Sequence, residues 1–121
     1  MSQKEIKYFK TKSIKLPGTS FSEPYLRSKY FKNEKVFLTL FWSHLVQKRE
    51  RDRVRRLKFF PCAMDLIIKS ALNPETRENF QKKDELLHRF YGETKDGDKF
   101  VVQIKENKRS KRKGLISIYN E

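Results

Sequence analysis

The sequence has few of the residues on which several common kinds of protein depend. A single cysteine, Cys62, excludes an internal disulfide framework and a cysteine-rich zinc site. The two histidines lack carboxylate or thiolate partners at metal-ligand spacing, so we expect neither a metal site nor a cofactor. No apolar run approaches the ~20 residues of a membrane-spanning helix, and no hydrophobic stretch follows the charged N-terminus as in a signal peptide. We therefore expect a cytoplasmic protein that is not bound to a membrane.

Acidic residues are scarce beside the basic ones. The chain has 121 residues, with 29 Lys and Arg against 15 Asp and Glu, and a formal net charge of +14. Such a surplus attracts polyanions and raises the rate at which they are encountered, so nucleic acid is the first candidate partner. Ten Phe, five Tyr and one Trp supply enough apolar surface for one modest core, which argues against disorder.

The first part of the chain differs in composition from the rest. Residues 1–34 are rich in lysine and are interrupted by Pro17, Gly18 and Pro24, which predicts a basic extended lead or arm. Residues 35–121 have the periodic apolar patterns of a single folded domain.

Two helices are predicted in the first half of this domain. A short strand at 35–38 is followed by Thr39, which can cap a helix that runs through Lys48 or somewhat beyond. Pro61 suits the first turn of a second helix, and Pro74 stops it. Apolar residues recur at helical spacing in both segments, so each helix has one face for the core.

Three strands are predicted in the last third of the chain, at 85–92, 99–105 and 115–119, and a further one starts near 79–82. The Asp-Gly pair that ends at Gly97 is a hairpin signal. Because the helices precede an antiparallel meander, the expected fold class is α+β. We expect N-terminal helices packed on one face of a C-terminal antiparallel β-sheet of about four strands.

Alternation along these strands divides their side chains between two faces of the sheet. The apolar face would meet the helices and consists of Phe100, Val102, Ile104, Ile116 and Ile118. The polar face carries cations, hydroxyls and an amide, and it consists of Arg89, Tyr91, Gln103, Lys105, Ser117 and Tyr119. His88 alternates with Arg89, so we expect it on the helix side as a hydrogen-bonded core histidine.

Two segments hold much of the positive charge. The first, 47–58, contains Arg49, Arg51, Arg53, Arg55 and Arg56. The second is the tip of the last hairpin, with Lys108, Arg109, Lys111, Arg112 and Lys113. The ordinary explanations are a solvated helix end for the first and a lysine-guarded sheet edge for the second. We favour phosphate contact for the first, because its two acidic residues cannot balance its arginines, and the second would then clamp a nucleic-acid backbone.

His44 lies on the first predicted helix, at the border of its apolar stripe. Metal-independent RNA cleavage needs a base for the 2′-OH, an acid for the leaving 5′ oxygen, and cations for the charge on the phosphate. An imidazole suits the first two tasks because the reference pKa of histidine is ~6.5. An ordinary helix-border histidine is the competing explanation. DNA lacks the 2′-OH, so a catalytic set of this kind would select RNA.

Five short motifs follow one another between residues 35 and 120. They are a helix with Phe41, Trp42 and His44, a helix that ends at Asn73 and Pro74, a strand with Arg89 and Tyr91, a valine-rich strand that ends at Lys105, and a closing strand with Ser117 and Tyr119. In this order they resemble the nuclease superfamily that joins barnase, EndoU, colicin-type tRNA-cutting toxins and RelE, known as the BECR fold.

The resemblance implies a small metal-independent ribonuclease, usually a toxin or effector, that cuts tRNA, rRNA or mRNA. It would make His44 the general acid or base, Arg89 and Lys105 the phosphate-binding cations, and Ser117 the hydrogen-bond donor to phosphate. Tyr119 would stack on a base or orient the substrate. A toxin would also have an acidic antitoxin or immunity protein as its partner.

Two other functions stay open. The arginine-rich segment after His44 departs from the family pattern, and no second histidine occupies a catalytic position, so a non-catalytic RNA- or DNA-binding module on the same scaffold is the main alternative. A structural or interaction protein that uses its charge only for docking is the third, and no feature of the sequence supports it directly.

Overall fold

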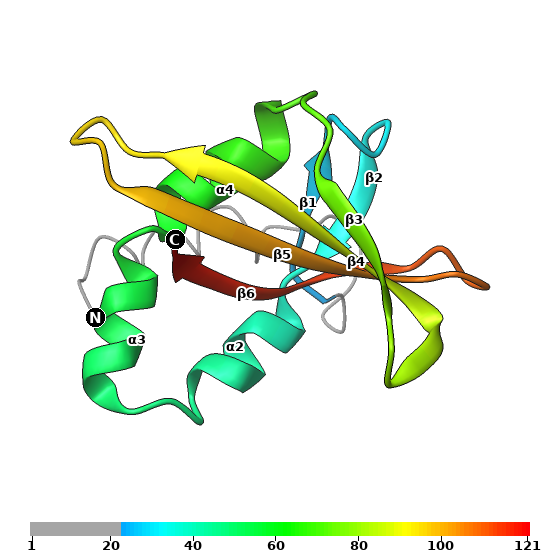
Figure 1. Ribbon diagram of the computed structural model, residues 1–121, viewed down its shortest axis with the longest axis horizontal. Helices are drawn as coiled ribbons and strands as arrows, with labels where there is room; N and C mark the ends of the chain where they lie inside the picture. Colours follow the sequence, from blue (N-terminus) through cyan, green and yellow to red (C-terminus); the bar gives the residue numbers. More distant parts are fainter. Residues whose placement is uncertain (1–22) are drawn as a thin grey trace.

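The computed structural model describes residues 23–121, and its fold is α+β, with three helices packed on a six-stranded mixed sheet (Figure 1). In chain order the elements are β1 (Tyr25–Ser28), β2 (Glu34–Phe37), α2 (Thr39–Leu45), α3 (Glu50–Leu57), α4 (Phe60–Lys69), β3 (Glu75–Asn79), β4 (Lys82–Glu93), β5 (Lys99–Asn107) and β6 (Lys113–Asn120). The strands lie in the order β1-β2-β6-β5-β4-β3. All neighbouring strands are antiparallel except β2 and β6.

The α+β class is confirmed, but the expectation of about four strands in a purely antiparallel sheet is wrong. The additional strands are β1, which lies where an extended lead was expected, and β2, which corresponds to the short strand predicted at 35–38. The two form a hairpin that precedes the helices and joins the sheet beside β6. β2 runs parallel to β6 and pairs with it only at Val36 with Lys113 and at Phe37 with Gly114. The domain boundary expected after residue 34 falls within β2, and residues 1–22 of the expected lead lie outside the described part of the chain.

The helices begin where the sequence predicts and end earlier. α2 begins at Thr39 but ends at Leu45, and the basic segment that follows forms a separate helix, α3. α4 has proline in its first turn, as predicted, but it ends at Lys69. Ser70 adopts extended backbone angles (φ −75°, ψ 133°), and its hydroxyl accepts a 3.2 Å hydrogen bond from the backbone N–H of Leu72. This local bond competes with continuation of the helix.

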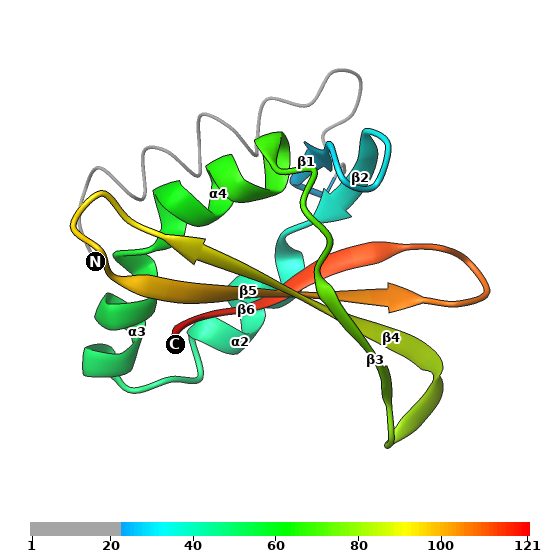
Figure 2. The same ribbon diagram turned by 45° about the horizontal axis from the view of Figure 1, so that its top comes forward.

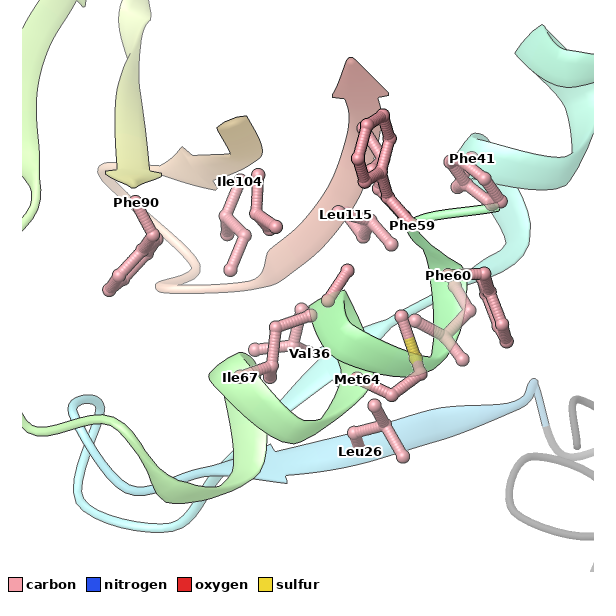
Figure 3. Close-up of a cluster of buried hydrophobic side chains, with 14 of the residues drawn as sticks. Leu26, Val36, Phe41, Phe59, Phe60, Met64, Ile67, Phe90, Ile104 and Leu115 are labelled. Atoms are coloured by element: carbon pink, nitrogen blue, oxygen red, sulfur yellow. The ribbon is translucent and has the colours of Figure 1, made fainter. Parts of the chain in front are cut away.

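α4 supplies the centre of the core. Phe60, Met64 and Ile67 recur at helical spacing, and their side chains are at most 3% exposed. In Figure 3 these side chains lie between Leu26 of β1 and Leu115 of β6. Because α4 contacts strands as far apart in the sheet as β1 and β4, the sheet curls around it (Figure 2). α2 and α3 pack against β6 instead.

The strand register confirms the two faces of the meander. Phe100, Val102, Ile104 and Ile118 are at most 1% exposed and belong to the core. On the other face, Arg89 lies opposite Gln103, and Gln103 lies opposite Ser117. Two residues further along each strand, on the same face, Tyr91 lies opposite Val101, and Val101 lies opposite Tyr119.

Ile116 breaks the predicted alternation. The register of β5 and β6 shifts between Gln103 and Ile104, because Gln103 pairs with Ser117 whereas Ile104 pairs with Leu115. Ile116 is the extra residue of this bulge, and Leu115 takes the buried position that the alternation assigned to it. The placement of Ile116 in the core was therefore wrong.

Gly92 is required by the packing of one core ring, which yields a test of the fold. A Cβ at Gly92 would lie 2.4 Å from Cζ of Phe100, whose ring is buried and stacks on Phe59 at 5.4 Å between centroids. Gly92→Ala should therefore lower the free energy of unfolding in urea by about 1–3 kcal/mol, the usual cost of overpacking. Gly114→Ala is the control, because its Cβ would meet the nearest atom at 3.6 Å. Equal effects of the two substitutions would contradict the packing at Phe100.

Candidate functional site

The outer edge of β6 is where the helices meet the polar side of the sheet. β2 pairs with β6 only as far as Gly114, so the backbone beyond this point has no neighbouring strand on that side. Two side chains bond to the carbonyls there. Nδ1 of His44, on α2, lies 3.3 Å from the oxygen of Ile116, and Nη1 of Arg56, on α3, lies 3.1 Å from the oxygen of Ile118.

Arg56 is the most constrained cation of this region. Its Nη1 also donates a 2.9 Å hydrogen bond to Oγ of Ser117, and its Nε donates a 3.2 Å bond to Asp52 one turn earlier on α3. The side chain is only 19% exposed. These bonds use Nε and Nη1, so within residues 23–121 Nη2 has no hydrogen-bond partner. The guanidinium is thus held in place with one nitrogen still able to bind an anion.

The hydrogen bond of His44 determines which ring nitrogen carries the proton in the neutral imidazole. A carbonyl oxygen can only accept a hydrogen bond, so Nδ1 must be the donor to Ile116. Nε2 is then the unprotonated nitrogen and can accept a proton. The side chain is exposed, which leaves Nε2 accessible to a substrate.

A hollow of about 320 Å³ lies at this junction, and we call it the β6 hollow. Its lining includes His44, Arg56 and Ser117, and it is completed by Phe41, Leu45, Gln47, Lys48 and Ile116. The structure thus brings together His44 and Ser117, two of the residues to which the resemblance assigned catalytic tasks. It adds Arg56, which the sequence suggested only as one of several phosphate-contacting arginines.

Arg89 lies on the same face as Ser117 but further along the sheet. The two are separated by Gln103 on the intervening strand, so their Cα atoms are roughly 10 Å apart at the usual strand spacing. Nε of Arg89 donates a 3.0 Å bond to Gln103, and Nη1 lies 3.9 Å from Glu75. Arg89, Gln103 and Ser117 therefore form one polar row across three strands.

The aromatic residues form the neighbouring row. Tyr91 and Tyr119 lie on either side of Val101, which is only 2% exposed although it lies outside the main cluster of core side chains. Tyr91 is 48% exposed, so its ring is available on the surface. This row puts two rings beside the polar row, as the sequence predicts for a nucleic-acid surface.

Lys105 lies apart from the β6 hollow. Its Nζ is 3.3 Å from Glu85, a carboxylate that is largely buried, and it lines a separate hollow of about 300 Å³ with Phe37, Leu40 and Arg112. It is therefore not brought together with His44 and Ser117, contrary to the arrangement that the resemblance implied.

The arginines of α3 have different surroundings. Arg53 donates a 2.6 Å bond to the backbone oxygen of Lys48 and so ties α3 to the preceding loop. Arg49, Arg51 and Arg55 are exposed, and none of them forms an ion pair with any residue from 23 to 121. These three are the exposed arginines of the segment, and no carboxylate of the described residues neutralises them.

The cations of the last hairpin are mostly paired. Lys108 bonds to Glu78 at 2.9 Å, Arg109 lies 3.7 Å from Asp84, and Arg112 bonds to Glu23. Lys111 is exposed and lacks an ion pair within the described residues. Lys113 is only 3% exposed, so the expectation that it contacts nucleic acid is wrong.

Lys113 belongs to a buried polar network that also contains His88. Nζ of Lys113 bonds to Glu34 at 2.9 Å and lies 3.8 Å from Glu106. The ring of His88 bonds to Glu106 through Nε2 and to Thr76 through Nδ1, both at 2.8 Å. His88 is 5% exposed, so its interpretation as a hydrogen-bonded core histidine is confirmed. The network links β2 to β3 through the strands between them.

Comparisons with known proteins do not assign this chain to a family. No family model matches the chain, and no curated protein or solved structure is significantly similar to it. Between residues 23 and 121, no group of three or more His, Cys, Asp or Glu side chains lies close enough to hold a metal ion. None of the helices in this part of the chain is long and apolar enough to cross a membrane.

The contacts of Arg56 predict a loss of stability when it is replaced. Arg56→Gln removes the bonds to Ser117 and to the oxygen of Ile118, and leaves partly buried acceptors without a charged donor. We expect a decrease of about 1–3 kcal/mol in the free energy of unfolding, measured in urea. Arg55→Gln, at an exposed neighbouring position without an ion pair in the described residues, should change it by less than about 0.5 kcal/mol. Similar values for the two variants would contradict the role of Arg56 at the β6 edge.

Proposed function

We propose that this protein is a metal-independent endoribonuclease and that the β6 hollow is its catalytic centre. The observation that supports this most is the convergence of three side chains on one accessible hollow. These are the imidazole of His44, the guanidinium of Arg56 and the hydroxyl of Ser117. A proton acceptor beside an anion-binding pair meets two of the three requirements of cleavage through the 2′-OH, and water can supply the proton for the leaving oxygen.

The proposed reaction assigns one task to each group. Nε2 of His44 takes the proton of the 2′-OH, and the 2′ oxygen attacks the adjacent phosphorus. The bond to the 5′ oxygen breaks, and that oxygen leaves with a proton from water. The products are a 2′,3′-cyclic phosphate and a 5′-hydroxyl. Nη2 of Arg56 and the hydroxyl of Ser117 would donate to the phosphate oxygens, where negative charge accumulates.

The polar row extends this centre along the sheet. Arg89 lies two strands from Ser117, so in this proposal it holds a neighbouring phosphate of the same RNA strand. Tyr119 lies on the same face, two residues after Ser117, and would orient the substrate or stack on a base. Lys105 has no catalytic task in this proposal, since it pairs with Glu85 in a different hollow.

The order of the elements supports the same proposal. The helix with His44 comes first, α4 follows, and β4, β5 and β6 carry Arg89, Lys105 and Ser117 in turn. This is the order of the motifs that resemble the BECR superfamily. On that basis we propose a toxin or effector that acts on tRNA, rRNA or mRNA in the cytoplasm. An acidic antitoxin or immunity protein would be its natural inhibitor, given the net charge of +14.

The role of His44 can be tested by its removal. The wild-type protein, incubated with total cellular RNA in EDTA, should generate fragments with 2′,3′-cyclic phosphate ends. His44→Ala should lower the cleavage rate by about 10²–10⁴-fold, because proton transfer is lost. The melting temperature should change little, since the side chain is exposed and water can replace its 3.3 Å bond to the oxygen of Ile116.

Ser43→Ala is the matched control for this test, because Ser43 is the exposed neighbour of His44 and, within residues 23–121, its side chain bonds only to the backbone of its own helix. It should cleave like the wild type. Unaltered cleavage by His44→Ala would rule out this residue as the base. Absence of cleavage by the wild type on a broad set of RNAs, with RNA binding intact, would reject the enzyme.

A non-catalytic RNA- or DNA-binding module is the second candidate, and the exposed arginines of α3 favour it. Arg51 and Arg55 lie four residues apart on one face of the helix without ion pairs in the described part of the chain. Arg51→Gln with Arg55→Gln should weaken RNA binding and reduce the slope of log affinity against log salt by about 0.7 for each lost contact with a single strand. Fluorescence anisotropy at several salt concentrations measures both quantities.

The control for this double variant is Lys69→Gln with Lys95→Gln, which removes the same charge at exposed positions on another side of the domain. If both double variants weaken binding equally, the α3 arginines act only through net charge. A reduced salt slope for the α3 variant alone, together with a wild type that cleaves no RNA, would favour the binding module over the enzyme.

A further inference from the structure

The first hairpin carries a compact group of cations and aromatic rings on its outer face. Tyr25 lies opposite Phe37, and Arg27 lies opposite Lys35, so all four side chains project from the same side of β1 and β2. Arg112 from the last hairpin joins them, because its guanidinium lies over the ring of Phe37 at 3.9 Å from the centroid. We call these five residues the cation–aromatic cluster.

The two rings hold the three cations at defined positions. Nζ of Lys35 lies 4.7 Å from the centroid of Tyr25, and the guanidinium of Arg27 lies 5.6 Å from the same centroid. Tyr25 and Phe37 themselves meet edge to face, with centroids 6.0 Å apart. Cation–π contacts reduce the freedom of long basic side chains, so the cluster presents its charges in a preorganised arrangement.

Among the described residues, this arrangement is electrostatically unfavourable. Arg27 and Lys35 are directly opposite like charges on neighbouring strands, which is a destabilising pair. Arg112 is paired with Glu23, whereas Arg27 bonds to the backbone oxygen of Asn33, and Lys35 has no acidic partner within residues 23–121. A bound anion would relieve the repulsion that the fold itself leaves in place.

The cluster lies on the same face of the sheet as the polar row. Phe37 pairs with Gly114 of β6, and Gly114 pairs with Lys105 of β5, whose side chain is on that face. Phe37 and Arg112 also line the hollow of about 300 Å³ that contains Lys105. A strand bound in the β6 hollow could therefore continue over this face towards the cluster.

We propose that the cation–aromatic cluster is a second phosphate-binding site, which anchors the backbone of RNA away from the β6 hollow. The choice of RNA as the polyanion rests on the proposed function. A lipid surface fits the cluster less well. The rings of Tyr25 and Phe37 are half-buried beneath the cations, so neither ring projects far enough to enter a bilayer. Phosphate contact is independent of sequence, so the site would serve RNAs of different sequence.

The test measures binding in a background that cannot cleave. Arg27→Gln with Lys35→Gln is introduced into the His44→Ala protein, and a fluorescein-labelled oligouridylate is the probe. We expect binding about tenfold weaker at low salt, and a salt slope smaller by about 0.7 for each lost contact. The melting temperature should stay the same or rise, because a repulsive pair is removed. Lys69→Gln with Lys95→Gln in the same background is the control for net charge.

Each outcome decides the proposal. A loss of affinity and of salt slope beyond the control, without a lower melting temperature, supports it. Equal behaviour of the two variants overturns it, and so does a lower melting temperature with unchanged binding, which would make the cluster structural. Retained RNA binding with lost binding to phosphatidylserine vesicles would also overturn it. Binding is measured without cleavage, so the two proposals can fail separately. The second phosphate-binding site can be supported even if the wild type proves inactive, and it can be overturned even if the wild type cleaves RNA.

Discussion

The incomplete pairing of β6 is the constraint on which the rest of the structure depends. β2 covers the outer edge of this strand only to Gly114, so the backbone beyond it must find other partners. His44 and Arg56 bond to two of the carbonyls there, at Ile116 and Ile118. The same bonds hold an imidazole and a guanidinium beside Ser117. A structural requirement of the sheet edge thereby assembles the chemical groups of the candidate site.

The positive charge of the chain is used in two ways that composition cannot distinguish. Lys113 is buried and joins strands through Glu34 and Glu106, and His88 completes that network with Thr76. Such cations hold the sheet together. Arg51 and Arg55, by contrast, face solvent without acidic partners among the described residues. Only the second kind leaves positive charge free for an external anion, and both α3 and the first hairpin carry cations of this kind.

Local patterns predicted much of the framework. Periodic apolar residues predicted the position of α4, and proline predicted its first turn, because both signals act within a few residues of the chain. Alternation placed Arg89, Gln103 and Ser117 on one face, and it placed His88 on the other. The prediction failed at Ile116, because a bulge depends on the register between two strands and not on either strand alone.

The sequence by itself determined the α+β class, the surplus of positive charge and, except at the bulge of β6, which residues lie on each face of the last three strands, because composition and short-range periodicity encode these properties. Only the tertiary structure decided that the first hairpin joins β6, that Arg56 and not Lys105 accompanies His44 and Ser117, and that Lys113 is buried. Arg56 and Ser117 are 61 residues apart in the chain. Their contact depends on how α3 packs against β6, the last strand of the chain, and no local pattern specifies that packing.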